Sequence, residues 1–210
     1  MIMADNDNPD TANPLHGRGG IDGMADTNES SSVDAGVGSG GNSVILVNQS
    51  DEEVGTMDKM EAHRKGLLHR AFSIFIFNSR GEMLLQQRAE EKYHSPGLWT
   101  NACCSHPLPG EATLSAAERR LYEELGFRAT LNKLFSFTYK SVFDNGLTEH
   151  EFDHVYAGTY DGDIYPDINE VMNYEYRELS WIDKELEKYP EKFTTWFRIA
   201  FPELRSLLPL

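Results

Sequence analysis

The chain has 210 residues, of which 40% are apolar and 11% aromatic, so it is long enough to form one sizeable hydrophobic core. Its formal net charge of −15 argues against nucleic-acid binding, because a phosphate backbone needs a cationic surface. No apolar run is long enough to span a bilayer, and the first residues lack the apolar segment of a signal peptide, so we expect a cytoplasmic protein that binds no membrane.

The first part of the chain differs in composition from the rest. Residues 1–41 are rich in Asp, Asn, Ser and Gly and contain few large apolar side chains. Such a segment buries too little apolar surface to offset the entropy lost on ordering. We therefore predict a disordered tail over 1–41 and a single folded domain over 43–208.

Strands dominate the first half of the predicted domain. Residues 44–47 have the composition of a short strand, and 57–63 are long enough for one or two helical turns. The continuous apolar run 71–77 predicts a strand buried on both faces. A turn sequence, Asn-Ser-Arg-Gly, then leads into a hairpin partner over 82–88, and a further strand is expected over 99–103.

One long helix is predicted at the centre of the chain. Apolar residues recur at helical spacing from Leu114 to Leu125, and Gly126 is suited to end a helix, so the prediction is a helix over 112–125. The remaining predicted elements are strands over 128–139, 149–160 and 174–182 and helices over 183–188 and 193–201. Strands on both sides of a central helix, with helices at the end, indicate a mixed α/β (α+β) domain.

The only two cysteines are neighbours, Cys103 and Cys104. A disulfide between adjacent residues is strained, so both are expected to be thiols in a reducing compartment. Free cysteine is usually a small buried apolar residue, which we expect for Cys103. Cys104 precedes His106 by two residues and lies near the start of the predicted helix. A metal, cations and the helix dipole would lower its pKa and make it a usable acid or base.

The central helix carries a charged pattern, and its end reads Arg119-Arg120-Leu-Tyr-Glu123-Glu124-Leu-Gly-Phe. This pattern resembles the Nudix box, which ends R-E-hydrophobic-x-E-E-x-G-hydrophobic and uses helical glutamates to hold divalent metal on a diphosphate. Aligned on the paired glutamates, the outer glutamate of the box falls on Glu111. The resemblance predicts a diphosphate-binding helix.

Two positions depart from the box, because its leading glycine is Ser105 and the glutamate after its arginine is Arg120. Replacing a carboxylate by a guanidinium removes a metal ligand and adds a phosphate clamp. The helix is then less able to assemble the several metals that activate water for hydrolysis. An alternative interpretation is an exposed helix face on which Arg120 and Glu124 form an ion pair one turn apart.

Three histidines and two glutamates form a second candidate cluster, namely His63, His69, His106, Glu149 and Glu151. The two glutamates form E-x-E, which places both side chains on one face of an extended segment. Nitrogen and oxygen donors of this number suit octahedral Mn, Mg or Fe, or an expanded Zn site. Any one of these histidines is also explained by ordinary hydrogen bonding. That is the role we expect for His94, His150 and His154.

The segments G-L-L-H-R-A-F, P-G-L-W-T-N-A-C-C-S-H-P and T-E-H-E together resemble those of the type 1 isopentenyl-diphosphate Δ-isomerase family, whose fold is Nudix-like. The similarity covers roughly residues 43–208. It implies a mixed β-sheet sandwiched by helices. It also implies the metal-dependent isomerisation of isopentenyl diphosphate to dimethylallyl diphosphate in isoprenoid biosynthesis, with a small-molecule diphosphate as the partner.

The resemblance also implies residue roles. Glu151, with Tyr139 beside it, would protonate the terminal methylene, and Cys104 would take the proton at C2 of the substrate. The implied ligands of a resident Mn²⁺, Mg²⁺ or Zn²⁺ are His63, His69, His106, Glu149 and Glu151. A second Mg²⁺, carried by the substrate, would be held by Glu124 and the carbonyl of Cys104. The implied substrate contacts are Lys59, Arg88, Lys92 and Arg120 on the diphosphate and Trp196 on the carbocation.

Two other functions compete with the isomerase. A Nudix hydrolase would cleave a nucleoside or prenyl diphosphate, but Arg120 in place of a glutamate and the Cys-x-His pair count against it. A non-catalytic protein would use the His/Glu cluster only to bind a structural metal. Release of phosphate would favour the first alternative, and folding in chelator without isomerase activity under any metal would favour the second.

Overall fold

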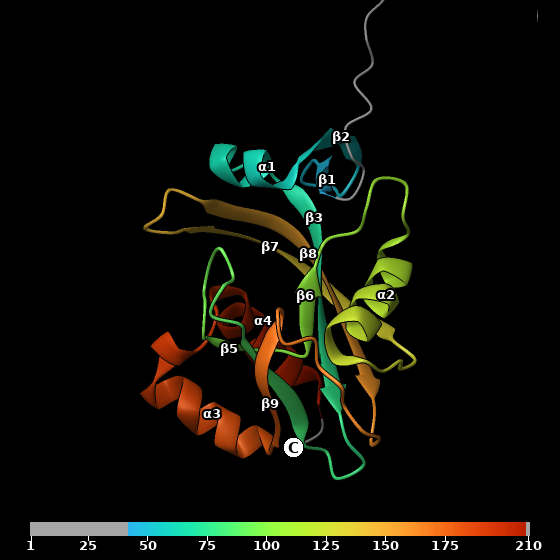
Figure 1. The fold of residues 1–210 in the computed structure, drawn as a ribbon, viewed down its shortest axis with the longest axis vertical. Coiled ribbons are helices and arrows are strands. Elements are labelled where there is room, and N and C mark those ends of the chain that lie inside the picture. The colour runs from blue at the N-terminus through green and yellow to red at the C-terminus, as the bar shows by residue number, and fades with distance from the viewer. Residues whose placement is uncertain (1–41, 209–210) are drawn as a thin grey trace, which may run out of the picture. The chain divides into compact units, whose positions relative to one another are not determined.

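The computed structural model describes residues 42–208, so the predicted disorder of 1–41 lies outside the described residues. Within 42–208 the strands belong to one sheet with the backbone order β2-β1-β3-β4-β5, to which β6, β7, β8 and β9 pair (Figure 1). The strands are β1 Ser43–Val47, β2 Glu53–Asp58, β3 His69–Phe77, β4 Met83–Arg88, β5 Trp99–Thr100, β6 Cys103–Ser105, β7 Asn132–Val142, β8 Thr148–Thr159 and β9 Val171–Arg177.

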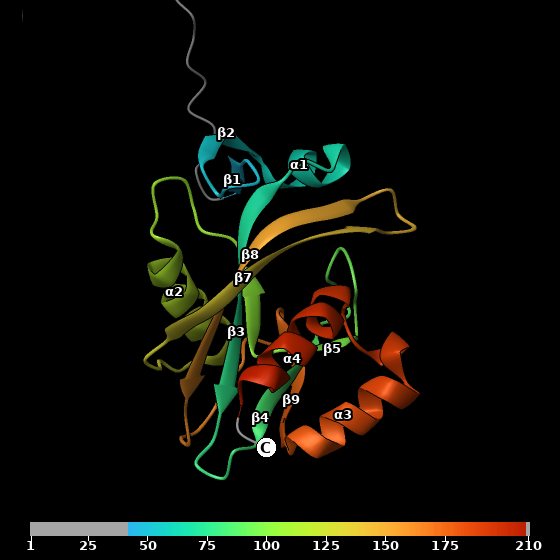
Figure 2. The ribbon, with the colours of Figure 1, turned by 180° about the vertical axis from the view of Figure 1, so that it is seen from behind.

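Helices cover both faces of the sheet. They are α1 Lys59–Lys65, α2 Thr113–Leu125, α3 Leu179–Lys188, a 3-10 turn Pro190–Lys192 and α4 Thr195–Leu207. Figures 1 and 2 show α2 on one side of β3 and the pair α3 and α4 on the other. The predicted mixed α/β fold with a sheet between helices is confirmed. None of the helices described over 42–208 is long and apolar enough to cross a membrane.

Strand β3 is the centre of the sheet, paired in parallel with β8 and antiparallel with β6. Successive side chains of β3 point to opposite faces of the sheet, so they pack into two separate core clusters. Phe72, Ile74 and Ile76 pack in a cluster with residues of α2. Phe75 packs in a second cluster with residues of α4. Burial on both faces explains why the sequence of this strand is continuously apolar.

The predicted central helix is present as α2, which begins one residue later than expected with Ala112 as its N-cap. Leu121 and Leu125 are fully buried against the sheet, as their helical spacing predicts. The helix ends at Gly126, whose φ of 75° is left-handed. A Cβ at this position would lie 2.6 Å from the Tyr165 carbonyl oxygen, so the close approach of the following loop also requires glycine.

Three other element predictions need correction. The strand predicted over 99–103 is two short strands, β5 and β6, and the Asn101 amide between them donates to the carbonyl oxygens of Ile74 and Cys103. The strand predicted over 174–182 ends at Arg177, and α3 begins at Leu179. Its buried Ile182 belongs to a helical apolar stripe rather than to a strand. Strand β2 was missed, because few of its side chains are buried.

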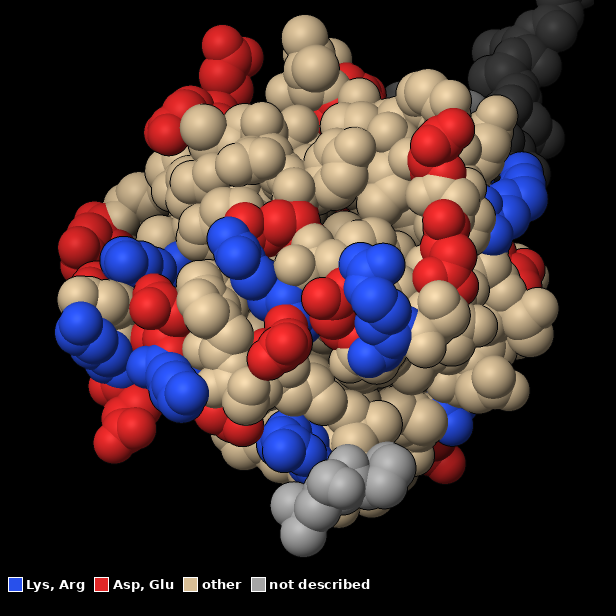
Figure 3. Space-filling model, turned by 90° about the horizontal axis from the view of Figure 1, so that it is seen from below, with Lys and Arg blue, Asp and Glu red and all other residues tan. Residues whose placement is uncertain are grey.

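Charged residues are mixed on the surface. Figure 3 shows Lys and Arg side chains interspersed with Asp and Glu side chains over the face drawn there. Several of the pairs are within ion-pair distance, such as Arg80 with Glu82 and Arg205 with Asp183. Exposed pairs of this kind contribute little to stability. The group of cations that bears on function lies in the pocket described next.

Candidate active site

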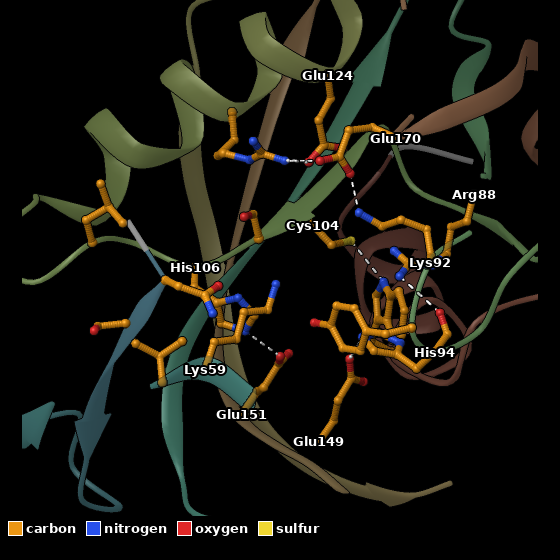
Figure 4. A pocket seen from close by; sticks show the side chains of 18 of the residues that line it. Lys59, Arg88, Lys92, His94, Cys104, His106, Glu124, Glu149, Glu151 and Glu170 are labelled. Carbon is orange, nitrogen blue, oxygen red and sulfur yellow. Dashed lines mark hydrogen bonds and ion pairs between the residues drawn. The ribbon is translucent and has the colours of Figure 1, made fainter. Parts of the chain in front are cut away.

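A cavity of about 300 Å³ lies where β1, α1, α2, α4 and the ends of several strands meet (Figure 4). Most of the side chains predicted to act in the site line it: Lys59, Arg88, Lys92, Cys104, His106, Arg120, Glu124, Tyr139, Glu149, Glu151 and Trp196. The other two, His63 and His69, are fully buried and do not line the cavity. Residues from nearly the whole domain therefore converge on one space.

Strand register places three of these side chains in a row. His69 on β3 is the register partner of Glu151 on β8, and Glu151 is also the partner of Tyr139 on β7. Directly paired residues project from the same face of a sheet. An imidazole, a carboxylate and a phenol thus lie side by side across three strands, although their positions in the sequence are far apart.

Four side chains offer ligand atoms that all lie within 4.8 Å of one another, namely those of His63, His69, His106 and Glu151. Glu151 Oε1 is 2.9 Å from His106 Nε2 and 3.5 Å from His69 Nε2. The buried Nε2 atoms of His63 and His69 have no hydrogen-bond partner among residues 42–208. Unpartnered buried nitrogens beside a carboxylate fit a divalent metal ion.

The protonation states of the histidines in this cluster also agree with metal binding. Burial lowers the pKa of His106 to about 3, and burial followed by the charge of His69 lowers the pKa of His63. Both rings are therefore neutral near pH 7, and the neutral imidazole is the form that binds metal. The described residues can hold a metal ion here.

Glu149 falls in a second group, which shares only His63 with the other four predicted ligands. It lies with His63 and His94, and its Oε1 is 2.9 Å from His94 Nε2. His94 was expected to be an ordinary hydrogen-bonding histidine. It does make such a contact, but within the pocket, where its ring is also 5.7 Å from the ring of Trp196. Sequence reasoning therefore missed His94 as a pocket residue.

Tyr139 joins the two glutamates. Its hydroxyl is 2.8 Å from Glu149 Oε2 and 2.7 Å from Glu151 Oε2. One O–H donates to only one of them, so the other contact needs a proton on a carboxyl group. Burial and the charge of Glu151 raise the pKa of Glu149 to about 8, which makes Glu149 the protonated partner. Burial opposes ionisation of Glu151, but the hydrogen bond from His106 and the neighbouring His69 ring hold its pKa well below the usual value.

The thiol of Cys104 faces this group from β6. Its sulfur accepts a hydrogen bond from Trp196 Nε1 at 2.9 Å and donates to Asn101 Oδ1 at 3.0 Å. Burial, followed by the charge of Asp153, raises the pKa of Cys104 to about 12. Without a bound metal the pKa is thus shifted opposite to the expected direction, because desolvation and a neighbouring carboxylate outweigh the favourable contacts. The described site therefore holds a protonated thiol.

The orientation of Asn101 explains how the thiol is held. Both hydrogens of its amide nitrogen go to buried carbonyl oxygens, those of Ile74 and Cys103, so its Oδ1 is fixed toward the sulfur. Thr100 donates a further hydrogen bond to the same Oδ1. Sequence reasoning missed Asn101, although it lies within the T-N-A-C-C-S-H-P segment that carries the family resemblance.

Two of the predicted diphosphate contacts, Arg120 and Lys92, lie on the side of the pocket next to α2. Arg120 Nη2 is 2.6 Å from Glu124 Oε1, and Glu124 is buried. The ion pair of the alternative interpretation is thus present, but in the pocket wall and not on an exposed helix face. Arg120 also pairs with Glu170 at 3.1 Å, and Glu170 contacts Lys92. Sequence reasoning missed Glu170, which lies in a loop with no recognised motif.

Two further cations, Arg88 and Lys59, line the pocket. The Arg88 guanidinium lies 5.3 Å from the ring of Trp196 and donates to the His94 carbonyl oxygen at 3.2 Å. Lys59 lies over the ring of Tyr93 at 4.9 Å. Four cations, Lys59, Arg88, Lys92 and Arg120, therefore line one pocket, where an anionic ligand would enter.

Glu111, the outer glutamate of the Nudix-like pattern, makes hydrogen bonds within the protein. Glu111 accepts two hydrogen bonds from Arg119, at 2.8 and 2.7 Å, and one from the Leu108 amide at 2.9 Å. These bonds attach the loop that follows β6 to helix α2.

Comparison with known proteins identifies the family. A model described as "NUDIX domain" matches residues 67–197. "Isopentenyl-diphosphate Delta-isomerase" of Pectobacterium atrosepticum is 55% identical over 163 residues, covering 77% of this chain and 90% of that protein. The protein of the same name from Serratia proteamaculans is 50% identical over 161 residues, covering 77% of this chain and 90% of that protein.

Among solved structures, DR0079 from Deinococcus radiodurans has a TM-score of 0.59 at 24% identity, covering 70% of this chain and 90% of that one, which supports the fold. The fold likeness, the Nudix domain match and the close relatives agree with one another. The chain therefore belongs to the isopentenyl-diphosphate Delta-isomerase family and carries a Nudix domain.

Proposed function

We propose that the chain isomerises isopentenyl diphosphate to dimethylallyl diphosphate in isoprenoid biosynthesis, with Glu151 and Cys104 handling the two protons. One observation carries this proposal. A buried carboxylate and a partly buried thiol line the same pocket, in a chain whose close relatives bear the name of that isomerase. The reaction adds a proton at one carbon and removes another two carbons away, so it needs one acid and one base across a narrow slot.

The acid side is the Glu149–Tyr139–Glu151 group. The substrate alkene is unactivated, so its protonation creates a tertiary carbocation and needs a proton held ready at the terminal methylene. The Tyr139 hydroxyl lies within hydrogen-bond distance of both Glu149 and Glu151. The proton passes along these oxygens to Glu151 and from there to the methylene carbon.

The base side is Cys104. Its own proton first leaves to solvent, a loss that a bound metal and the nearby cations would favour. As a thiolate it then removes the proton from C2, and the electron pair of the broken C–H bond forms the new double bond. A raised thiol pKa makes the corresponding thiolate a strong base, which retains the proton that it takes. The Trp196 indole N–H, 2.9 Å from the sulfur, is the donor that stabilises the thiolate.

The carbocation between these groups needs protection from water. Trp196 is 2% exposed and its ring supplies a π face that attracts a cation. Trp196 comes from α4, which packs against the sheet by its apolar face, so the ring is rigidly placed. Its second role, as a hydrogen-bond donor to the thiol, explains why a tryptophan suits this position.

We propose two metal positions, one at the His/Glu cluster and one at Glu124. His63, His69, His106 and Glu151, with Glu149 as the fifth, would hold Mn²⁺, Mg²⁺ or Zn²⁺. Such an ion would fix Glu151 and tune its acidity. Glu124 and the Cys104 carbonyl would hold a Mg²⁺ carried by the substrate. Lys59, Arg88, Lys92 and Arg120 would bind the diphosphate oxygens.

The test is to incubate the protein with isopentenyl diphosphate and a divalent metal in D₂O and to follow the products by NMR. The proposal predicts dimethylallyl diphosphate with deuterium at the carbon that was protonated. Phosphate release without isomerisation would instead support a hydrolase. A protein that folds but converts no substrate with Mn²⁺, Mg²⁺ or Zn²⁺ would support a metal-binding role alone.

A further inference from the structure

Glu170 neutralises two of the cations proposed to bind the diphosphate. It is the residue before β9, and its side chain is 23% exposed. One of its carboxylate oxygens accepts from Arg120 at 3.1 Å and the other contacts the Lys92 ammonium group (Figure 4). Neither cation is therefore available to an incoming anion at its full charge.

Glu124 adds a second carboxylate to the ion pairs that Glu170 makes. Arg120 pairs with Glu124 at 2.6 Å, so Lys92, Glu170, Arg120 and Glu124 form a chain of alternating charge along the pocket wall. The four charges sum to zero. Burial opposes ionisation of Glu170, but Lys92 and Arg120 hold its pKa below the usual value, so its carboxylate is charged near neutral pH.

Two carboxylates beside two cations treat free and metal-bound diphosphate differently. A free diphosphate is a polyanion, and its attraction to Lys92 and Arg120 is opposed by repulsion from Glu124 and Glu170. The partly buried setting leaves this repulsion less screened than it would be at the surface. A divalent cation carried on the diphosphate reverses the sign of the interaction with both carboxylates.

We infer that Glu170 makes this part of the pocket selective for metal-bound diphosphate, by opposing the binding of diphosphate without metal. The inference rests on the proposed function only in taking a diphosphate as the ligand. It assigns Glu170 a role in specificity, not in proton transfer. No motif of the sequence pointed to this residue.

The test measures binding and not turnover. Inorganic pyrophosphate is titrated into the full chain by calorimetry, once with excess Mg²⁺ and once with free Mg²⁺ removed by chelator. For Glu170→Gln we expect the ratio of the two dissociation constants, without and with Mg²⁺, to fall about tenfold relative to the unmodified protein, equivalent to about 1.4 kcal/mol. The fall should come from tighter binding without the metal, because only the carboxylate charge is removed.

Glu123→Gln is the matched control. Glu123 also bonds Arg120, at 2.7 Å, but its side chain is 42% exposed and does not line the pocket. We expect its ratio to equal that of the unmodified protein. Glu170→Asp, which keeps the charge, should also keep the high ratio. Glu170→Ala tests the same loss of charge with a second side chain, and the backbone bonds at this position do not involve the carboxylate.

An unchanged ratio in both Glu170→Gln and Glu170→Ala would overturn the inference, as would an equal change in Glu123→Gln. Either result is separable from failure of the proposed function. Isomerisation by the unmodified protein is measured on its own, and it decides that proposal whatever the pyrophosphate ratios are.

Discussion

Cys103 and Cys104 show how far single residues can be interpreted from the sequence. Strand alternation sends Cys103 into the core with α2 and Cys104 toward the pocket, and the prediction that Cys103 is buried is confirmed. Without metal, burial and then the charge of Asp153, which is distant in the sequence, shift the thiol pKa opposite to the predicted direction. Local spacing identified the candidate residue but could not identify its electrostatic neighbours.

The pH dependence of substrate binding should reflect Lys59. Burial, followed by the charge of Lys92, lowers the pKa of Lys59 to about 8. The ammonium group is charged below that pH and neutral above it, and only the charged form attracts a diphosphate. We therefore expect the affinity for inorganic pyrophosphate to fall as the pH rises through about 8, measured by calorimetry as a function of pH.

The matched variant is Lys59→Arg, because a guanidinium stays charged throughout this range. Its affinity for pyrophosphate should remain level to higher pH than that of the unmodified protein. If the two profiles fall at the same pH, Lys59 is not the group responsible.

Residues without a recognised pattern were not found by sequence reasoning. Asn101, His94 and Glu170 each act through partners on other elements, and each would be ordinary in a strand end or loop. The predicted ligands His69 and Glu151, in contrast, were found because they belong to segments that resemble a family. Register in the sheet, which the sequence does not specify, then places them side by side.

At the scale of elements, the end of α2 should be sensitive to one methyl group. Gly126 has a φ of 75°, and a Cβ there would lie 2.6 Å from a backbone oxygen. We expect Gly126→Ala to lower the free energy of unfolding by about 2 kcal/mol or more, measured by urea denaturation. Gly110→Ala separates the two causes, because its φ is 77° but nothing lies within 4 Å of its Cβ. That variant should cost about 1 kcal/mol. Equal losses in both would show that the contact is unimportant.

Elements with a single clear period were predicted well. Helix α2 and strand β3 match their predicted ranges closely, because their apolar patterns reflect one buried stripe and two buried faces. The boundary between β9 and α3 was placed wrongly, since a short apolar pattern around Ile182 fits either period. Strand β2 is largely exposed, so its sequence contains no apolar alternation to detect.

At the scale of the whole molecule, a bound metal would join parts that are distant in the sequence. His63 is on α1, His69 on β3, His106 follows β6 and Glu151 is on β8. A ligand that binds only the folded state stabilises it. We expect the melting temperature of chelator-treated protein to rise when Mn²⁺ or Zn²⁺ is added.

The rise should disappear in His69→Ala and persist in His150→Ala. His150 lies on β8 beside Glu151, but its ring contacts the Gly66 carbonyl oxygen and is outside the cluster. An equal rise in both variants would place the metal elsewhere.

The most direct test of the account compares the two adjacent thiols. Cys104→Ala removes the proposed base, and Cys103→Ala removes a core thiol that faces the opposite side of the sheet. Isomerisation of isopentenyl diphosphate is measured by NMR alongside the melting temperature. We predict that Cys104→Ala folds but loses about 10³-fold or more in kcat, while Cys103→Ala keeps its turnover at some cost in stability. Retained turnover in folded Cys104→Ala would contradict the role of the thiol.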